Sequence, residues 1–293
     1  FPIDVVAYQR VNERYLGDSS PASPVMGKYE NGFRVGGVKM ILDGSPQGKT
    51  AFLTTPYKVP PEGADADYRG YPIMPAETVD ALFDKFVKAG IPILAHANGD
   101  AAADLFVNAL SQSIDGEIQV DHRTVMIHAQ TVREDQLDSM ATMKAIPSFF
   151  SAHTFYWGDW HRDSVFGVER ASRISPTASS LAKGITFTVH NDAPIVPPDM
   201  LRLLWATTNR LTRSGQVLGE DQKISTLEAI KAITINAAYQ YFEEDIKGSI
   251  EVGKQADLVI LSKNPLSIPT TQLLEIKVQR TIARGQTVFA LAD

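Results

Sequence analysis

The sequence has 293 residues, 44% of them hydrophobic, which is enough to bury a sizeable core and is near the length of a single (β/α) barrel. Its formal net charge of -6 comes without a cluster of Lys and Arg, which argues against nucleic acid as the main partner and favours a small molecule. The absence of Cys excludes disulfides and thiolate metal sites, so a transition metal would have to be held by His, carboxylate or modified Lys.

The chain begins within an apolar run, from Ile3 to Tyr8, that is typical of the interior of a fold. It has no initiator Met and no secretory signal at this end, so we expect an N-terminal portion to precede Phe1. No apolar segment approaches the roughly 18 residues that a membrane span needs, and no membrane partner is expected. The compartment stays open between the bacterial cytoplasm and periplasm.

Two segments of different character follow. Residues 9–33 are polar and irregular, with a surface loop at 18–24, and lead to a predicted buried strand at 35–42. Residues 43–75 are rich in Gly and Pro without a helical period, and a loop of this length in a compact domain is usually functional or disordered. A helix then begins at Pro75 and ends before Gly90. One face of it carries Val79, Leu82, Phe83, Phe86 and Val87.

From Gly90 onward, predicted strands alternate with amphipathic helices. The strands are 91–96, 124–128, 144–149 and 185–190; the helices between them are 100–112, 131–142 and one near 176–183, and helices 198–212 and 226–241 follow. This alternation indicates βαβ units and a parallel sheet, and at this length an α/β fold of the (β/α)8 TIM-like barrel type. The tail differs, because 256–261, 278–283 and 287–289 are short antiparallel-type strands that predict a small β appendage.

Residues able to bind a metal stand at the ends of three of these strands. His96 and His128 are one βα unit apart, and Asp192 follows His128 by two such units. Because the strands of a parallel barrel end at the same face, these side chains should converge there. A single His in such a place is more often structural, and Asp192 could instead cap the next turn. The repeated placement favours neutral imidazole ligands to zinc.

Lys39 is unusual because it lies within the predicted buried strand. Burial lowers the pKa of a lysine and frees a neutral amine, which can react with carbon dioxide to give a metal-binding carbamate. The alternative is a stem that packs while the head pairs with Asp43 or another carboxylate, and the residues alone favour this alternative. Asp43 is predicted to form a turn or to stand behind the ligands, and Asp100 to cap the helix that follows it.

An aromatic segment follows the strand at 144–149 and contains His153, Trp157, Trp160 and His161. We expect it to be a loop that lines the mouth of the site, or else a lid that only packs. His122, which precedes its strand, is expected at the surface.

Five motifs together resemble the amidohydrolase superfamily. They are Gly37-Val38-Lys39 with Asp43-Gly44-Ser45, His96 to Asp100, Ile127 to Gln130, His190 to Pro194, and Lys247 to Leu258. The pattern is most similar to the amidohydrolase-3 or YtcJ-like metal-dependent hydrolases, and within them to the AepA-like branch of exoenzyme regulatory proteins. The resemblance extends over essentially the whole chain.

The resemblance implies a role for each ligand. Lys39 would match the carboxylated lysine of strand four that bridges two zinc ions, and His96 and His128 the ligands of strands five and six. Asp192 would match the aspartate of strand eight, which binds one metal and takes a proton from the attacking water. The residues that would support these ligands or contact the substrate are Asp43, Asp100, His153, Trp157 and His190. The implied reaction is hydrolysis of a C–N bond in a small amide-like molecule by a metal-activated water.

One part of the family's pattern is absent, because no His-x-His pair precedes His96. On this alignment, residues 1–245 would form strands three to eight of a barrel that is incomplete at its N-terminus, and residues 246–293 the C-terminal part of a β-sandwich. The chain alone is then expected to bind at most one metal ion weakly and to hydrolyse little. The alternative is a non-catalytic ligand-binding or regulatory protein with a degenerate metal site. A homodimer is one assembly that we consider.

Overall fold

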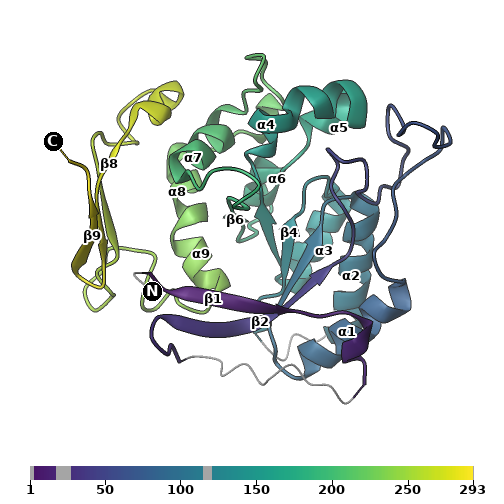
Figure 1. Ribbon diagram of the computed structural model, residues 1–293, viewed down its shortest axis with the longest axis horizontal. Helices are drawn as coiled ribbons and strands as arrows, with labels where there is room; N and C mark the ends of the chain where they lie inside the picture. The colour runs from purple at the N-terminus through teal and green to yellow at the C-terminus, as the bar shows by residue number, and fades with distance from the viewer. Residues whose placement is uncertain (1–2, 18–27, 115–120, 293) are drawn as a thin grey trace.

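The computed structural model describes residues 3–17, 28–114 and 121–292, so the predicted loop at 18–24 lies outside the described residues. Six parallel strands form one sheet in chain order: β1 (Val5–Arg10), β2 (Phe33–Ile41), β3 (Ile93–Ala97), β4 (Val125–His128), β5 (Ile146–Phe149) and β6 (Thr188–Val189). The sheet curls, with β1 and β6 at its two edges (Figure 1). The predicted parallel α/β fold is confirmed, and the curled sheet corresponds to part of a TIM-like barrel.

Helices pack around this sheet. Between the strands lie α1 (Ala76–Lys88), α2 (Asp100–Ile114), α3 (Glu134–Met143) and α6 (Thr177–Ala182), and β6 is followed by α7 (Met200–Asn209), α8 (Thr226–Ile233) and α9 (Ile235–Gln240). The apolar face predicted for α1 is buried, and its Phe83 meets Phe106 of α2 edge to face, with ring centroids 5.4 Å apart. The helix ends as predicted, because Gly90 follows it with a positive φ of 66°.

The strands are short apolar runs because both of their faces are covered. Val38, Met40, Ile93, Ala95 and Met126 have no exposed surface, as expected for a parallel sheet between helices and a packed interior. A charged or polar residue inside such a strand therefore needs a specific explanation.

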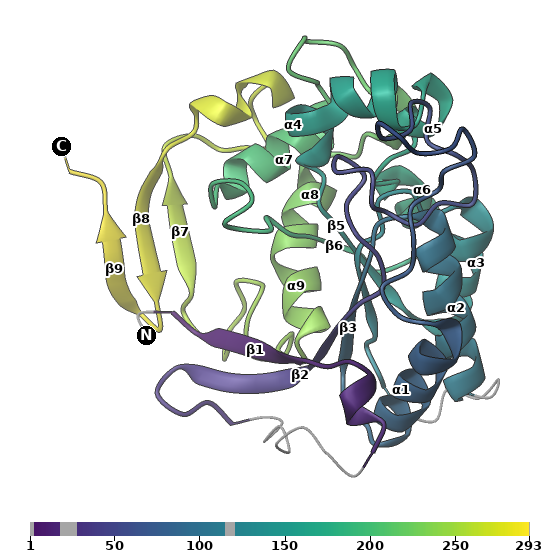
Figure 2. The ribbon, with the colours of Figure 1, turned by 45° about the vertical axis from the view of Figure 1, so that its right-hand side comes forward.

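The C-terminal segment forms a separate antiparallel sheet of three strands, β7 (Leu258–Leu261), β8 (Val278–Ala283) and β9 (Gln286–Ala290). Figure 2 shows this sheet beside the start of β1, where Asp4 forms ion pairs with Lys247 and Arg284. The predicted β appendage is therefore present as one sheet. A second sheet that would complete a sandwich does not occur among residues 246–292.

The segment after β5 differs from the prediction of a loop. It forms α4 (His153–Trp160), which continues into a π-helical turn (His161–Val165) and is followed by α5 (Val168–Ser172). Aromatic residues have modest helix propensity, but tertiary packing decides here: Phe155 meets Trp205 of α7 edge to face, with centroids 5.4 Å apart. The predicted helix 226–241 is also divided, at Thr234, whose φ of -126° and ψ of -95° are not helical.

His122 is buried, so the prediction of a surface position is wrong. Its side chain is 6% exposed, and its ring nitrogens lie 2.9 Å from the carbonyl oxygen of Met143 and 3.0 Å from the amide nitrogen of Thr124. Because both nitrogens find backbone partners, the ring can be buried without an unpaired polar atom.

The long segment 43–75 is ordered, although it contains turns and no helix or strand. Ala51, Leu53 and Tyr57 pack with Val165 and Phe166 in a small apolar cluster beside α5. The segment therefore packs against the π-helical turn and lies beside the end of β2.

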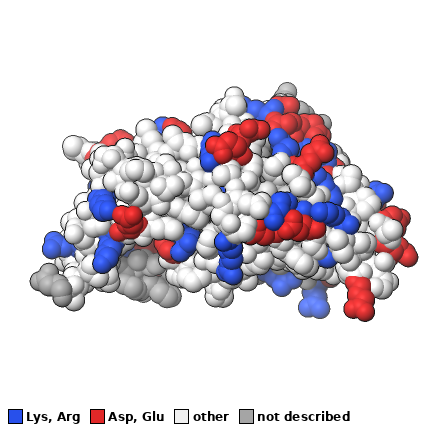
Figure 3. Space-filling model, turned by 90° about the horizontal axis from the view of Figure 1, so that it is seen from above, with Lys and Arg blue, Asp and Glu red and all other residues white. Residues whose placement is uncertain are grey.

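The distribution of surface charge and the lengths of the helices match what the composition predicts. Figure 3 shows basic and acidic side chains interspersed over one face of the molecule. Within the described ranges, no helix is both long enough and apolar enough to cross a membrane.

Candidate metal centre

The parallel register brings the predicted ligands to the same end of the sheet. Ile41 at the end of β2 pairs with His96, and Ala97 at the end of β3 pairs with His128. Asp192 follows β6 by three residues and reaches the same end. Lys39 pairs with Leu94, two residues before His96, so Lys39 and His96 lie on the same face of the sheet. The structure thus brings His96, His128 and Asp192 to one end of the sheet, with Lys39 on the same face as His96.

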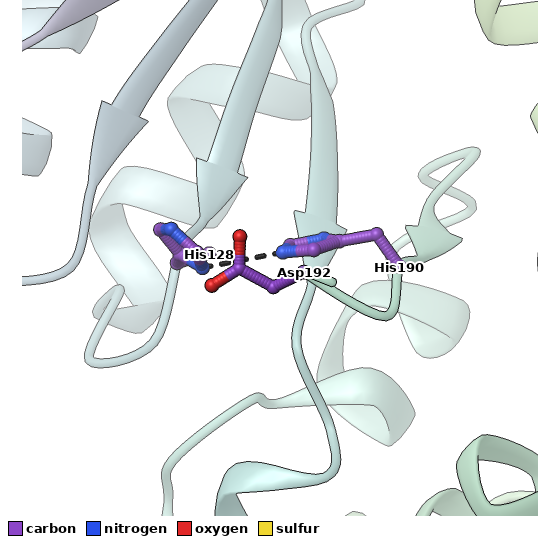
Figure 4. Close-up of side chains that lie close together, drawn as sticks. All are labelled: His128, His190 and Asp192. Carbon is purple, nitrogen blue, oxygen red and sulfur yellow. Dashed lines mark hydrogen bonds between the residues drawn. The ribbon is translucent and has the colours of Figure 1, made fainter. Parts of the chain in front are cut away.

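His128, His190 and Asp192 form the closest group in this centre (Figure 4). Each offers one ligand atom, and the three atoms lie within 4.8 Å of one another. The Nε2 atom of His190 is 3.2 Å from Nδ1 of His128. His128 and Asp192 have positive φ values of 74° and 63°. Such left-handed backbone is uncommon outside glycine and is often found at functional sites.

His96 is held from one side by the turn that follows β2. Its Nε2 atom lies 3.0 Å from the carbonyl oxygen of Gly44, 3.0 Å from Nδ2 of Asn98 and 3.5 Å from the carboxylate of Asp43. The carbonyl oxygen of Gly44 can only accept a hydrogen bond and the NH2 group of Asn98 can only donate one, so these contacts hold the ring in place in either tautomer. The ring lies across that of His128, with centroids 4.5 Å apart.

Asp43 stands behind His96 and joins two loops. Its fully buried carboxylate accepts hydrogen bonds from the backbone N–H groups of Phe52 (3.0 Å), Asn98 (2.9 Å) and Gly99 (2.8 Å). Burial raises the pKa of Asp43 to about 7, although the three N–H donors favour the ionised form. Asp43 thereby fixes the 43–75 segment against the turn between β3 and α2.

Burial keeps the histidines of the centre neutral at pH 7. It lowers the pKa of His96 to about 4 and of His190 to about 3, and it holds the pKa of His128 well below its usual range. Neutral imidazole is the form that binds metals. Burial also raises the pKa of the Asp192 carboxyl, while the charge of Lys39 opposes this.

Lys39 is a buried lysine within β2. Burial lowers the pKa of its ammonium group to about 8, despite the opposing charge of Asp192. None of the hydrogen bonds or ion pairs found among the described residues uses this ammonium group. The predicted alternative is a pair with Asp43 or another carboxylate. Asp43 is not that partner, because its carboxylate accepts backbone N–H groups and faces His96, whereas the carboxylate that interacts with the charge of Lys39 is Asp192. The donor set therefore fits a metal ion.

His153 and Trp157 lie next to this centre on α4. The ring of His153 is buried, with its centroid 6.0 Å from that of His128 and 5.6 Å from that of Trp157. Its Nδ1 atom is buried and has no hydrogen-bond partner among the described residues, and the same holds for Nε2 of the neighbouring His161. Buried polar atoms normally have partners, so these nitrogens are available to water or a ligand.

Asp100 lies apart from the ligands. The prediction that it caps α2 is wrong. The helix begins at Asp100 itself, and its carboxylate accepts a 2.9 Å hydrogen bond from the backbone N–H of Thr54 and a second from the Thr54 hydroxyl. Arg133 lies 3.5 Å away. Asp100 therefore holds the 43–75 segment near the site.

Two residues beside the centre are not predicted from the sequence. Ser148 of β5 and Thr188 of β6 are buried, and their hydroxyl oxygens lie 2.7 Å apart next to His190. The available signal was a hydroxyl residue inside each of two otherwise apolar strands, followed by His190 directly after the second. Placing His190 beside His128 required the pairing of β5 with β6.

Comparison with known proteins agrees with this geometry. The sequence profile of the amidohydrolase family matches residues 2–289. The chain belongs to the amidohydrolase family. YtcJ of Bacillus subtilis is 28% identical over 260 residues, which cover 87% of this chain and 47% of that protein. N-substituted formamide deformylase of Arthrobacter pascens is 27% identical over 203 residues, covering 68% of this chain and 36% of the deformylase.

The structural comparison gives the same result. A metal-dependent hydrolase from Pyrococcus horikoshii superimposes with a TM-score of 0.74 at 26% identity, covering 92% of this chain and 52% of the hydrolase. This amidohydrolase chain thus spans about half the length of the relatives that it matches, or less. The YtcJ-like character expected from the motifs is confirmed, and placement in the AepA-like branch stays a prediction.

Proposed function

We propose that the protein hydrolyses a C–N bond in a small amide-like molecule, with its reaction centre at Lys39, His96, His128 and Asp192. One observation carries this proposal: in a chain of the amidohydrolase family, His128, His190 and Asp192 offer ligand atoms within 4.8 Å of one another, and the ring of His96 lies 4.5 Å from that of His128. Similarity to N-substituted formamide deformylase makes N-formyl and N-acyl amines the first substrates to try.

The residues that would hold zinc are the same four, with Lys39 in its carboxylated form. We propose two zinc ions in the complete protein, bridged by carboxylated Lys39. Bound zinc polarises a carbonyl group and acidifies water. The lowered pKa of Lys39 favours carboxylation, because the neutral amine is the form that reacts with carbon dioxide. The Gly44 carbonyl oxygen orients His96.

Asp192 is proposed to carry the proton of the reaction. Its carboxylate lies within 4.8 Å of the nitrogens of His128 and His190 and is the most open of the three to solvent. It can accept a proton from the attacking water and return it to the nitrogen of the departing amine, which leaves better as a neutral amine. His153 and Trp157, whose rings lie beside the centre, are proposed to contact the substrate.

The proposal extends to organisation and partners. Residues 1–245 are proposed to act as the hydrolase barrel unit and residues 246–293 as part of a β-sandwich. The substrate is proposed to be the main partner, and the interspersed charges in Figure 3 support a small molecule over nucleic acid. A homodimer is the assembly to test first, by light scattering.

The test is an activity screen of the complete gene product, loaded with zinc, against N-formyl and N-acyl amines. Asp192→Asn should abolish turnover, whereas Asp135→Asn, a change at an exposed carboxylate on α3, should leave it unchanged. Full turnover by the Asp192→Asn variant would refute the assigned role. Zinc binding without turnover of any amide would instead support the alternative function, a ligand-binding or regulatory protein.

A further inference from the structure

His190 occupies a position in the centre that the family resemblance did not assign to a ligand. We propose that His190 is a further metal ligand, through Nε2, and that Ser148 is the positioning residue that holds its ring for this role. The inference rests on the proposed metal centre. It begins from the 3.2 Å approach of His190 Nε2 to His128 Nδ1 and from the carboxylate of Asp192 beside both (Figure 4).

The other side of the His190 ring faces a buried hydroxyl. Nδ1 lies 3.0 Å from Oγ of Ser148, a residue that is 1% exposed. The neutral imidazole ring has one N–H and one lone pair, so the two nitrogens cannot play the same role. Metal-binding histidines donate their remaining N–H to a neighbouring acceptor, which fixes the ring and its tautomer. A serine hydroxyl can accept, so Nδ1–H donated to Ser148 leaves the lone pair on Nε2, facing His128 and Asp192.

The hydroxyl of Ser148 is itself held in place. Oγ1 of Thr188 lies 2.7 Å from Ser148 Oγ and 2.7 Å from Oε1 of Gln240 at the end of α9. The series His190, Ser148, Thr188 and Gln240 therefore links β5, β6 and α9 by hydrogen bonds. Thr188 and Gln240 are both buried.

The arrangement does more than satisfy buried polar atoms. A purely structural role for Ser148 and Thr188 would be to bond β5 to β6, and the hydrogen bond between their hydroxyl groups fulfils it without His190. The added contact to His190 serves one side of the ring. On its other side, the only partner of His190 Nε2 among the described hydrogen bonds is a second histidine of the same centre. Two imidazole nitrogens and a carboxylate oxygen grouped in this way are typical of a zinc site.

The first test asks which nitrogen of His190 carries the proton. Long-range proton–nitrogen NMR spectra of the metal-free chain, labelled with 15N-histidine, report this directly; the chain has six histidines, and the signal lost in His190→Gln identifies the ring. We expect the proton on Nδ1 in the wild type and a shift of population toward Nε2–H in Ser148→Ala. A wild-type ring protonated on Nε2 would overturn the inference, whether or not the protein is an enzyme.

The second test measures zinc affinity by competition with a coloured chelator. Ser148→Ala should weaken binding about 10-fold, as loss of a group behind a ligand usually does, and His190→Gln should weaken it further. His122→Asn, which removes a buried histidine at the opposite end of β4 from His128, should bind zinc as the wild type does.

The outcomes separate this inference from the proposed function. If His128→Ala weakens zinc binding but a folded His190→Gln does not, His190 is not a ligand and the metal centre stands without it. If neither variant changes zinc binding, the metal centre itself is misplaced and both proposals fail. Circular dichroism of each variant establishes that the comparison is made between folded proteins.

Discussion

Removing the carboxylate of Asp43 should destabilise the protein strongly, although this residue is not a proposed ligand. The carboxylate is fully buried and accepts three backbone N–H groups from two loops. An unpaired buried donor costs about 1–3 kcal/mol, so Asp43→Ala, which leaves three donors unpaired, should lower the free energy of unfolding by about 3 kcal/mol or more. Asp43→Asn keeps one acceptor oxygen but turns an NH2 group toward an N–H group, and should cost about 1–3 kcal/mol.

Urea unfolding followed by circular dichroism measures these differences. Asp135→Ala is the matched control, because its carboxylate is 68% exposed and pairs with Arg133 at the surface, where an ion pair contributes about 1 kcal/mol at most. The loss in the free energy of unfolding should be largest for Asp43→Ala, smaller for Asp43→Asn and smallest for Asp135→Ala. Equal costs for the two alanine variants would refute the reasoning, since they would show that the three N–H groups find water when the carboxylate is absent.

Three further predictions concern changes at single residues. Bicarbonate should increase the zinc content of the wild-type chain, measured by mass spectrometry, but not that of Lys39→Met, because only a lysine amine can be carboxylated; an equal increase in both would contradict this. Burial lowers the pKa of His122, so the unfolded state binds its proton more readily. Stability should therefore fall as the pH drops below about 6.5, by at most about 1.4 kcal/mol per pH unit from this group, and His122→Asn should show a shallower fall in urea unfolding, an equal slope being the contrary result. Gly99→Ala places a Cβ 1.8 Å from the carbonyl oxygen of Phe52 and should cost about 1–3 kcal/mol, whereas Gly17→Ala, which meets nothing within 4 Å, should be nearly neutral in the same assay.

The order of strands and helices could be predicted because each βα unit repeats the same physical pattern. A strand buried on both faces is an apolar run, and the helix after it has one apolar stripe, as Val79, Leu82 and Phe83 of α1 show. The carboxyl ends of such strands share one face, so His96, His128 and Asp192 could be predicted to meet. Lys39 is the unusual case, because the sequence offered Asp43 as its partner and only the structure showed the Asp43 carboxylate bonded to backbone N–H groups instead.

Other features depend on contacts between distant segments and could not be predicted in this way. The aromatic segment after β5 is helical because Phe155 packs on Trp205, about 50 residues later in the sequence. Asp100 bonds Thr54 instead of the start of its own helix. The burial of His122 depends on the carbonyl group of Met143, which only the folded chain brings near. In each case a tertiary partner outweighs the local preference of the residue.

Two parts of the fold support the centre: the ends of the strands, which should determine metal affinity, and the 43–75 segment, which should determine stability and access. Its ligands come from strand ends, where neighbouring strands fix the backbone, and the hydroxyl groups of Ser148 and Thr188 support it from within the sheet. The 43–75 segment contacts the centre from outside through Asp43, which lies 3.5 Å from His96, and it is held there by the hydrogen bond between Thr54 and Asp100. Changes within the sheet should therefore act mainly on metal affinity, while changes in the segment act on stability and on access to the centre. Loops can vary over a fixed set of strand-end ligands, so the substrate preference of the proposed hydrolase centre should be determined by the 43–75 segment and α4.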